Sequence, residues 1–270
     1  MRIRTAYSFK KAVGDLDSVF NRLKKCKYPA FPITDTESTY GFRKWNDLCK
    51  NNNVKPVFGV ELAVTEKFGQ GKEAVFSYWT FVSRNDISKI NDLVTIATSS
   101  PEKVPCLLYN QLPEILKGDI IAICGNFFDF EKYKKLSQHK DVHFSLSPST
   151  SKFFYHTCKE HKVKFCASSD NVFCNKEDEN LYRSALGRKA FVQTYDQYIL
   201  DNNEFKKALS FVSDSDLKKS ISNRNKLLKE CNAELKQGVF LKPKEKKTLK
   251  ELCEIRAKKI GVDLNDQVYK

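Results

Sequence analysis

Apolar residues near the start of the chain recur with two different periods, which predict strands and helices in turn. Residues 30–35 form an apolar run that ends in Asp35, as expected for a buried strand. A second apolar run, residues 56–61, ends in Glu61. Between the two runs, one helical face gathers the apolar residues Phe42, Trp45, Leu48 and Cys49. The pattern therefore predicts a strand, an amphipathic helix and a second strand, with an acid at the end of each strand.

The same alternation continues to about residue 170. Further strands are predicted for residues 1–7, 74–83, 118–126, 143–146 and 163–168. Helices are predicted for residues 15–27, 86–100, 129–138 and 150–162. Strands that alternate with helices form a mostly parallel sheet covered by helices, either as an open sheet or as a closed barrel. We therefore expect an α/β fold.

Beyond residue 177 the pattern predicts helices alone, including a long one over residues 216–231 and a final one over residues 248–259. We interpret residues 1–235 as one α/β domain and residues 236–270 as a basic, helical extension. Its cations are candidates for contact with nucleic acid: Lys242, Lys244, Lys246, Lys247, Lys250, Arg256, Lys258 and Lys259. The alternative is a solvated helix face next to a flexible basic turn.

Composition and charge narrow the class of partner. The chain has 270 residues, with 47 Lys and Arg against 33 Asp and Glu, and its formal net charge is +14. This charge favours a polyanionic partner, bound non-specifically, although it also serves solubility. The nine cysteines are scattered through apolar stretches, which is typical of reduced thiols in a cytoplasmic protein. Because the chain has neither a signal-peptide core nor a run of about eighteen apolar residues, we expect no membrane insertion.

Two acids are candidates for chemistry because of where they stand. Asp35 and Glu61 are predicted to end neighbouring strands, and the carboxyl ends of parallel strands meet at one rim of an α/β fold. There they could hold a metal ion or form an acid/base pair, while the alternative is that each caps the next turn or helix. A zinc site made of His156, Cys158, His161 and Cys166 is a weaker alternative, because no Cys-x-x-Cys pair supports it. Phosphate-binding loops and a G-x-S-x-G motif are absent from the sequence.

Three stretches together resemble the PHP (polymerase and histidinol phosphatase) domain of bacterial DNA polymerase III alpha subunits. The first is YSFKKAVGDLDSVFNRLKKCKYPAFPITDTESTYGFRKWNDLCKNNNVKPVFGVEL, with a Tyr-Ser opening, a Thr-Asp strand end and Lys-Pro-x-x-Gly-x-Glu. The others are FCASSDNVFCNKEDENLYRSALGRK and LLKECNAELKQGVFLKP. The resemblance covers nearly the whole chain in the right order and is weakest between residues 66 and 148. It implies a distorted, seven-stranded (β/α) barrel like a TIM barrel.

The resemblance also implies a metal site that has lost most of its ligands. Active family members hold metal ions by histidine and carboxylate ligands, and the carboxylates that remain here are Asp35, Glu61 and Asp170. The first His-x-His of the family falls on Arg2 and Arg4, and an Asp falls on Lys11. Other histidine ligands fall on Thr36, Val172 and a position near Tyr78. We therefore expect these cations to replace metal charge, with Arg2 or Arg4 within salt-bridge reach of an acid, and no tightly bound Zn²⁺, Mn²⁺ or Mg²⁺.

Three hypotheses for the function follow from the resemblance and the charge. The first is a non-catalytic module of a DNA replicase that docks a polymerase palm and fingers segment or a proofreading exonuclease, in the cytoplasm of a bacterium or a phage-infected cell. The second is a metal-dependent phosphoesterase or 3′–5′ exonuclease, as in family members with intact ligands. The third is a separate basic protein that binds DNA or regulates a host, for which the charge is the only support.

Overall fold

The computed structural model describes residues 1–69, 76–125, 136, 138–187, 190, 192–236, 251 and 254–256. The chain divides into two compact units, Met1–Leu235 and Lys236–Lys270. In the second unit the structure describes residues 236, 251 and 254–256, of which 251 and 254–256 are helical. None of the described helices has the length and apolar character needed to span a membrane.

The first unit is built on a seven-stranded sheet in the order β1-β2-β3-β5-β6-β7, with β4 paired to β2. The strands are β1 Phe31–Ile33, β2 Pro56–Thr65, β3 Ser77–Ser83, β4 Cys106–Leu108, β5 Ile120–Cys124, β6 Val142–Leu146 and β7 Phe165–Ala167. All pairs are parallel except the two made by β3, which is antiparallel to both β2 and β5. The expected mostly parallel sheet is therefore confirmed, with one reversed strand. The chain between β2 and β3 is too short for the helical crossover that a parallel pair needs.

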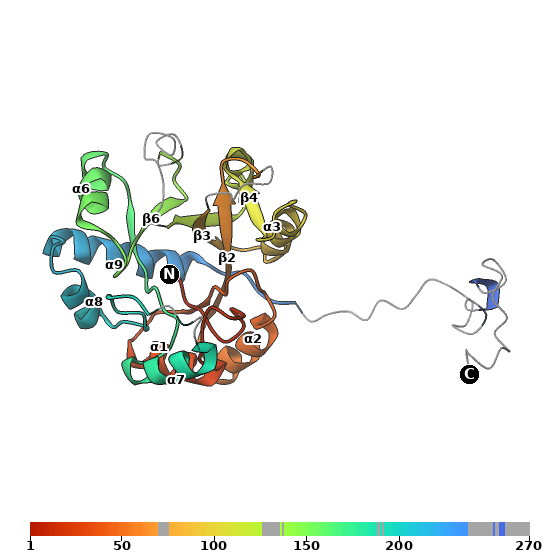
Figure 1. Cartoon of the computed structure of the whole chain (residues 1–270), viewed down its shortest axis with the longest axis horizontal. Coiled ribbons are helices and arrows are strands. Elements are labelled where there is room, and N and C mark those ends of the chain that lie inside the picture. The colour runs from red at the N-terminus through yellow and green to blue at the C-terminus, as the bar shows by residue number, and fades with distance from the viewer. Residues whose placement is uncertain are drawn as a thin grey trace. The chain divides into compact units, whose positions relative to one another are not determined.

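Helices surround the sheet of this unit (Figure 1). They are α1 Leu16–Lys25, α2 Phe42–Asn51, α3 Ser88–Thr98, α4 Leu112–Ile115, α6 Lys152–Glu160, α7 Glu179–Leu186, α8 Asn202–Ala208 and α9 Asp214–Glu230, with 3₁₀ turns at Tyr109–Gln111 and Lys176–Asp178. Their apolar faces pack on the sheet: α2, for example, buries Phe42, Trp45 and Cys49 as the periodicity predicts. The helix expected over residues 129–138 lies almost entirely outside the described residues.

The N-terminal segment fills the space between the two edge strands of the curled sheet. The Met1 amino group donates to the Ala167 carbonyl of β7 at 3.0 Å, and Thr34 N, just after β1, donates to the Ile3 carbonyl at 2.9 Å. The strand predicted for residues 1–7 is not regular, because other bonds of the segment go to side-chain hydroxyls. Arg2 N, for instance, donates to Ser168 Oγ at 2.9 Å. The segment therefore closes the barrel without forming a backbone ladder.

Helix α9 crosses the opposite, amino-terminal end of the parallel strands. Asn223 Nδ2 donates to the carbonyl of Phe165, the first residue of β7, at 2.8 Å. Lys55, which precedes β2, donates through Nζ to the Lys229 carbonyl at 2.6 Å. The buried side of the helix carries Leu217, Ser220, Arg224, Leu227 and Leu228. The carboxyl end of the strands, where Asp35 and Asp170 follow β1 and β7, is the other rim.

Candidate functional site

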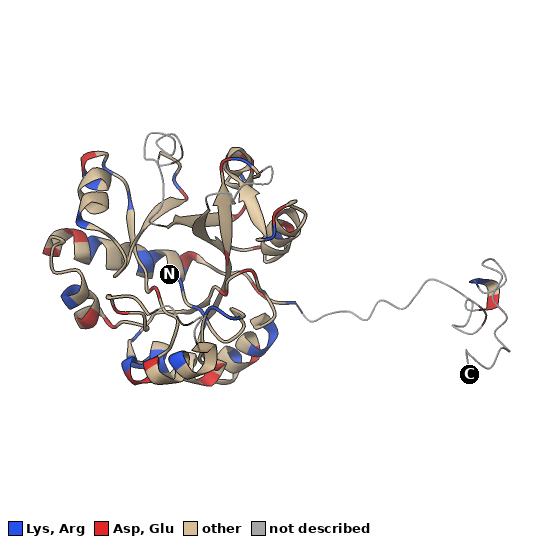
Figure 2. Ribbon diagram, viewed as in Figure 1, with Lys and Arg blue, Asp and Glu red and all other residues tan. Residues whose placement is uncertain are grey.

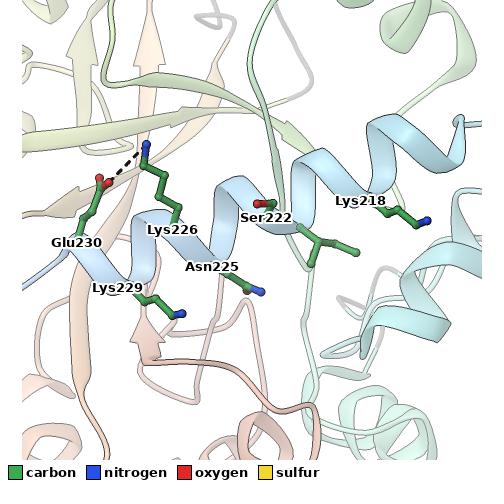
Figure 3. A pocket seen from close by; sticks show the side chains of 7 residues that line it. Lys218, Ser222, Asn225, Lys226, Lys229 and Glu230 are labelled. Atoms are coloured by element: carbon green, nitrogen blue, oxygen red, sulfur yellow. Dashed lines mark ion pairs between the residues drawn. The ribbon is translucent and has the colours of Figure 1, made fainter.

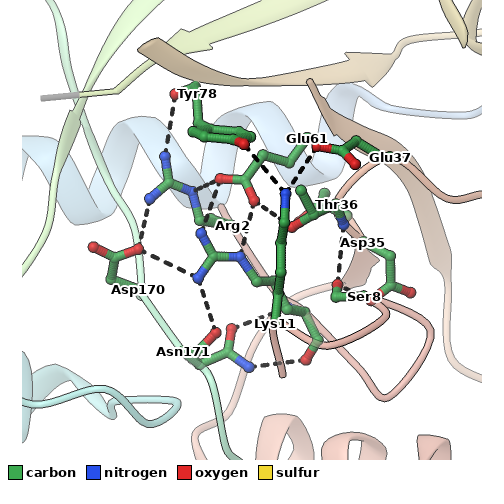
Figure 4. Close-up of polar contacts among 12 residues, drawn as sticks. Arg2, Ser8, Lys11, Asp35, Thr36, Glu37, Glu61, Tyr78, Asp170 and Asn171 are labelled. Carbon is green, nitrogen blue, oxygen red and sulfur yellow. Dashed lines mark hydrogen bonds and ion pairs between the residues drawn. The ribbon is translucent and has the colours of Figure 1, made fainter. Parts of the chain in front are cut away.

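Four charged side chains meet inside the barrel near its carboxyl rim: Arg2, Arg4, Glu61 and Asp170 (Figure 4). Glu61 does not end its strand as the sequence predicted, because β2 continues through apolar residues to Thr65. The strand can continue because Glu61, fully buried, is neutralised where it lies instead of turning toward solvent.

Arg4 donates two parallel hydrogen bonds to the Glu61 carboxylate. Arg4 Nε lies 2.9 Å from Glu61 Oε2, and Arg4 Nη2 lies 3.0 Å from Glu61 Oε1. The hydroxyl of Thr36 donates to Oε2 of the same carboxylate at 2.5 Å. Such a bidentate guanidinium–carboxylate pair is among the stronger polar contacts in proteins.

Arg2 joins the two carboxylates to each other. Its Nη1 donates to Asp170 Oδ1 at 2.6 Å, and its Nε lies 2.6 Å from Glu61 Oε1 without being aligned to donate a hydrogen bond. Arg4 Nη1 also lies 3.6 Å from Asp170 Oδ1. Both arginines are therefore within salt-bridge distance of both acids, which confirms the contact expected from the sequence.

The ion pairs decide the protonation of these acids. Burial alone would raise the pKa of Glu61, but Arg2 and Arg4 outweigh it and lower that pKa to about 2. For Asp170, too, burial raises the pKa but Arg2 and Arg4 outweigh it, and the pKa is lowered to about 2. The two acids in turn raise the pKa of Arg4. At neutral pH the cluster is a set of fixed, opposite charges.

Asp35 stands apart from the arginine contacts. Its Oδ1 accepts hydrogen bonds from Thr5 N at 2.6 Å and from Ser8 Oγ at 2.6 Å, and its Oδ2 accepts one from Thr5 Oγ1 at 2.8 Å. Burial nevertheless raises the pKa of Asp35, because these donors do not offset the loss of water around the carboxylate. Asp35 thus stabilises the loop of residues 5–8 by hydrogen bonds and takes no part in an ion pair within the cluster.

Lys11 does not join the three carboxylates. Its Nζ lies 2.8 Å from Glu37 Oε1, 3.3 Å from the Tyr78 hydroxyl and 4.6 Å from the centre of the Tyr78 ring. Although burial opposes it, the hydrogen bond to Glu37 raises the pKa of Lys11. Tyr78 also contributes its carbonyl, 3.3 Å from Arg2 Nη2.

Asn171 is a part of the site that the sequence did not reveal. Its side chain accepts from Arg4 N at 3.0 Å and donates to the Arg4 carbonyl at 2.8 Å, and its own carbonyl accepts from Arg4 Nη1 at 3.2 Å. Asn171 therefore fixes the backbone and the side chain of Arg4 together. The adjacent Asp170, carried over from the family, was the signal that could have pointed to it.

The remaining candidates lie elsewhere. Val172 is buried in the core and contacts no member of the cluster through a polar group. Within the described ranges no three His, Cys, Asp or Glu side chains group as metal ligands, so His156, Cys158, His161 and Cys166 do not form the alternative zinc site. In the basic C-terminal segment, Arg256 is exposed on a helix, whereas Lys242, Lys244, Lys246, Lys247, Lys250, Lys258 and Lys259 lie outside the described residues.

The donor set does not suit a divalent metal ion of the kind that the family resemblance implies. Both oxygens of Glu61 and Oδ1 of Asp170 are engaged by guanidinium groups, and Asp35 accepts from Thr5 and Ser8. No imidazole accompanies them among the described residues of this cluster, although Zn²⁺ sites usually include nitrogen or sulfur ligands. Two fixed guanidinium charges would also repel an added cation.

Curated relatives match a short stretch of the sequence. A DNA polymerase III subunit alpha from Staphylococcus aureus is 35% identical over 65 residues, and the one from Staphylococcus epidermidis is 30% identical over 66 residues. Each match covers 24% of this chain and 6% of the relative, so the chain corresponds to a small part of those proteins.

The fold is similar to that of a solved structure, a protein from Bifidobacterium adolescentis assigned as a metal-dependent phosphoesterase. The TM-score is 0.50 at 8% sequence identity, with 79% of this chain and 96% of that chain covered. At this identity the likeness concerns the fold alone. The sequence pattern of the PHP domain matches residues 1–242. Together with the curled sheet and its surrounding helices, this match establishes that the chain belongs to the PHP domain family.

Proposed function

We propose that this chain is the PHP module of a DNA replicase related to DNA polymerase III subunit alpha, and that it serves as a structural and docking element without turnover of its own. The observation that carries the proposal is the position of Arg2 and Arg4 between Glu61 and Asp170. In this arrangement the ion pairs hold the rim together, a role that a metal would otherwise fill. The module acts in the cytoplasm of a bacterium or a phage-infected cell.

Exposed aromatic side chains support the docking role. Phe9 is 79% exposed and Tyr40 is 85% exposed, and they stand on two loops near the ion-paired cluster. The loops are tied together, because Thr36 N donates to Ser8 Oγ at 3.0 Å and Lys11 pairs with Glu37 at 2.8 Å. Large aromatic side chains held on a rigid base are typical anchors of protein interfaces.

The partner is a polymerase palm and fingers segment or a proofreading exonuclease subunit. Co-purification with each of these, encoded by the source genome, tests the interface on the full chain. We expect a stable complex that the double variant Phe9→Ser, Tyr40→Ser weakens at least tenfold. The variant Ile96→Ser is the matched control, since Ile96 is an exposed apolar residue on α3, away from these loops. No complex with either partner would refute the docking role.

An activity assay separates this proposal from the phosphoesterase or exonuclease alternative. Purified protein is incubated with single-stranded DNA and Mn²⁺, and product formation is measured. We expect none. Turnover that Glu61→Gln abolishes would establish the enzyme and overturn the non-catalytic proposal.

A further inference from the structure

A line of exposed lysines follows the outer side of α9, at the end of the barrel opposite the arginine cluster. We define the basic stripe as Lys218, Lys219, Lys226 and Lys229. Figure 3 shows Lys218, Lys226 and Lys229 projecting from this helix beside Ser222 and Asn225. A hollow of about 690 Å³ is lined by three of the stripe lysines and their neighbours: Lys218, Lys226, Lys229, Ile221, Ser222, Asn225 and Glu230.

The spacing of the stripe results from the amphipathic pattern of α9. Leu217, Arg224 and Leu228 are buried on the side of the helix that faces the domain. The lysines fall on the remaining helical positions, so all four are exposed. From Lys218 to Lys229 the helix rises about 16 Å, at about 1.5 Å per residue.

The stripe keeps most of its positive charge. Within the described part of the chain, Lys218, Lys219 and Lys229 form no ion pair, and Lys226 reaches Glu230 only at 3.8 Å. The acids of the first turn are engaged by other lysines: Asp214 by Lys206 at 2.9 Å, and Asp216 by Lys159 at 2.9 Å. In Figure 2 this helix carries both blue segments, which mark Lys and Arg, and red segments, which mark Asp and Glu.

Neighbouring elements add charge of the same sign. Lys162 lines a second hollow, of about 310 Å³, together with Lys159, Lys219 and Asp216, and the Asp216 carboxylate pairs with Lys159. Lys55 is held against the C-terminal end of α9 by its bond to the Lys229 carbonyl.

We propose that the basic stripe of α9 binds the phosphate backbone of double-stranded nucleic acid. Lysine is a compact charge without the planar fork of arginine, so it contacts phosphate without reading bases. A single-stranded ligand fits less well, because single-strand sites combine cations with aromatic side chains on which bases stack. The first hollow has no aromatic residue in its lining. An acidic protein segment is the other polyanion that the test must separate.

The proposal is independent of the docking role, since the stripe lies at the other end of the barrel. The test measures fluorescence anisotropy of a labelled 20-base-pair duplex of mixed sequence, with the full chain, between 50 and 200 mM salt. The variant is Lys218→Gln, Lys226→Gln, Lys229→Gln. The control is Lys24→Gln, Lys44→Gln, Lys50→Gln, which removes the same charge from exposed positions of α1 and α2.

We expect the stripe variant to bind the duplex at least tenfold more weakly at 100 mM salt. The slope of log K against log salt should fall by about 2 to 3, since each phosphate contact contributes about 0.9. The control should stay within about twofold of the parent. Circular dichroism of both variants must match that of the parent, so that a loss of binding is not a loss of folding.

Three results would overturn the proposal. One is equal loss of affinity in the stripe and control variants. Another is an unchanged stripe variant while Lys244→Gln, Lys246→Gln, Lys247→Gln in the C-terminal segment loses binding. The last is stronger competition by the single strand, or by polyglutamate of equal charge, than by unlabelled duplex.

Discussion

At the scale of single residues, the arginine cluster makes stability depend on pH. The pKa values of Glu61 and Asp170, about 2 in the fold, lie below the values of about 4.3 and 3.9 expected in the unfolded chain. Their contribution is therefore fully present above pH ~4.5 and is lost as the pH falls towards 2. This contribution to the free energy of unfolding is on the order of 3 kcal/mol for each acid. Urea unfolding at pH 7, 5, 4 and 3 should show this loss.

Asp35 provides the internal control for that prediction. Its pKa is raised, so acidification favours the folded state through this residue instead of weakening it. The variant Asp35→Asn should therefore lose stability more steeply than the parent as the pH falls from 5 to 3. An unfolding free energy that is flat between pH 6 and 3 in both proteins would contradict the proposed ion pairs.

Removing one arginine should cost more than removing an exposed one. In Arg4→Met, Glu61 would keep its charge inside the barrel with one partner fewer, at a cost of about 3–5 kcal/mol. Arg43→Met breaks an exposed pair with Asp47 and should cost less than about 1 kcal/mol. Chemical denaturation of both variants at pH 7 measures the difference, and similar losses would show that the cluster does not stabilise the fold.

At the scale of elements, β2 and β3 approach each other at Gly59. A Cβ added there would lie 2.5 Å from the Phe81 carbonyl oxygen, a backbone atom that cannot move aside alone. Gly59→Ala should therefore destabilise the protein by about 1–3 kcal/mol. Gly118→Ala is the milder comparison, because its added Cβ would lie 3.3 Å from the Ile115 carbonyl oxygen, a tight contact that a shift of a few tenths of an ångström relieves. Thermal unfolding compares them, and equal midpoints would refute the close approach.

Elements with a strong period could be predicted from the sequence, and elements set by distant partners could not. The faces of α1 and α2 and the buried run of β5 follow from local spacing alone. The extension of β2 beyond Glu61 depends on Arg4, which is 57 residues away. The irregular N-terminal segment depends on hydroxyls such as that of Ser168, 166 residues away. The local spacing of apolar and polar residues does not indicate contacts between residues so far apart in the sequence.

The candidate site shows the same division. Arg2, Arg4, Glu61 and Asp170 could be aligned by resemblance, and they do meet. The supporting groups on Thr5, Ser8 and Asn171 could not be chosen in advance, because short polar residues occur in every loop and only the fold shows which ones reach a partner. The resemblance assigns Lys11 to the site, whereas its ion-pair partner is Glu37, which the resemblance does not single out.

At the scale of the whole molecule, the two ends of the barrel differ in chemistry. The carboxyl rim carries a cluster in which cations and acids are paired, with exposed aromatic residues nearby. The amino-terminal end carries lysines with few acids. The first face suits the proposed protein partner, and the second suits the proposed nucleic-acid ligand. We propose that Arg2 and Arg4 at the carboxyl rim supply the positive charge that a metal ion would otherwise provide.

Equilibrium dialysis against Mn²⁺ at pH 7, followed by elemental analysis of the full chain, tests that claim most directly. We expect less than about 0.1 equivalent of bound Mn²⁺, because the two guanidinium groups engage the carboxylates and repel a divalent cation. We also expect that adding a metal chelator leaves the thermal unfolding midpoint of the protein unchanged. One or more equivalents of Mn²⁺, lost in Glu61→Gln and accompanied by a chelator-sensitive midpoint, would contradict it.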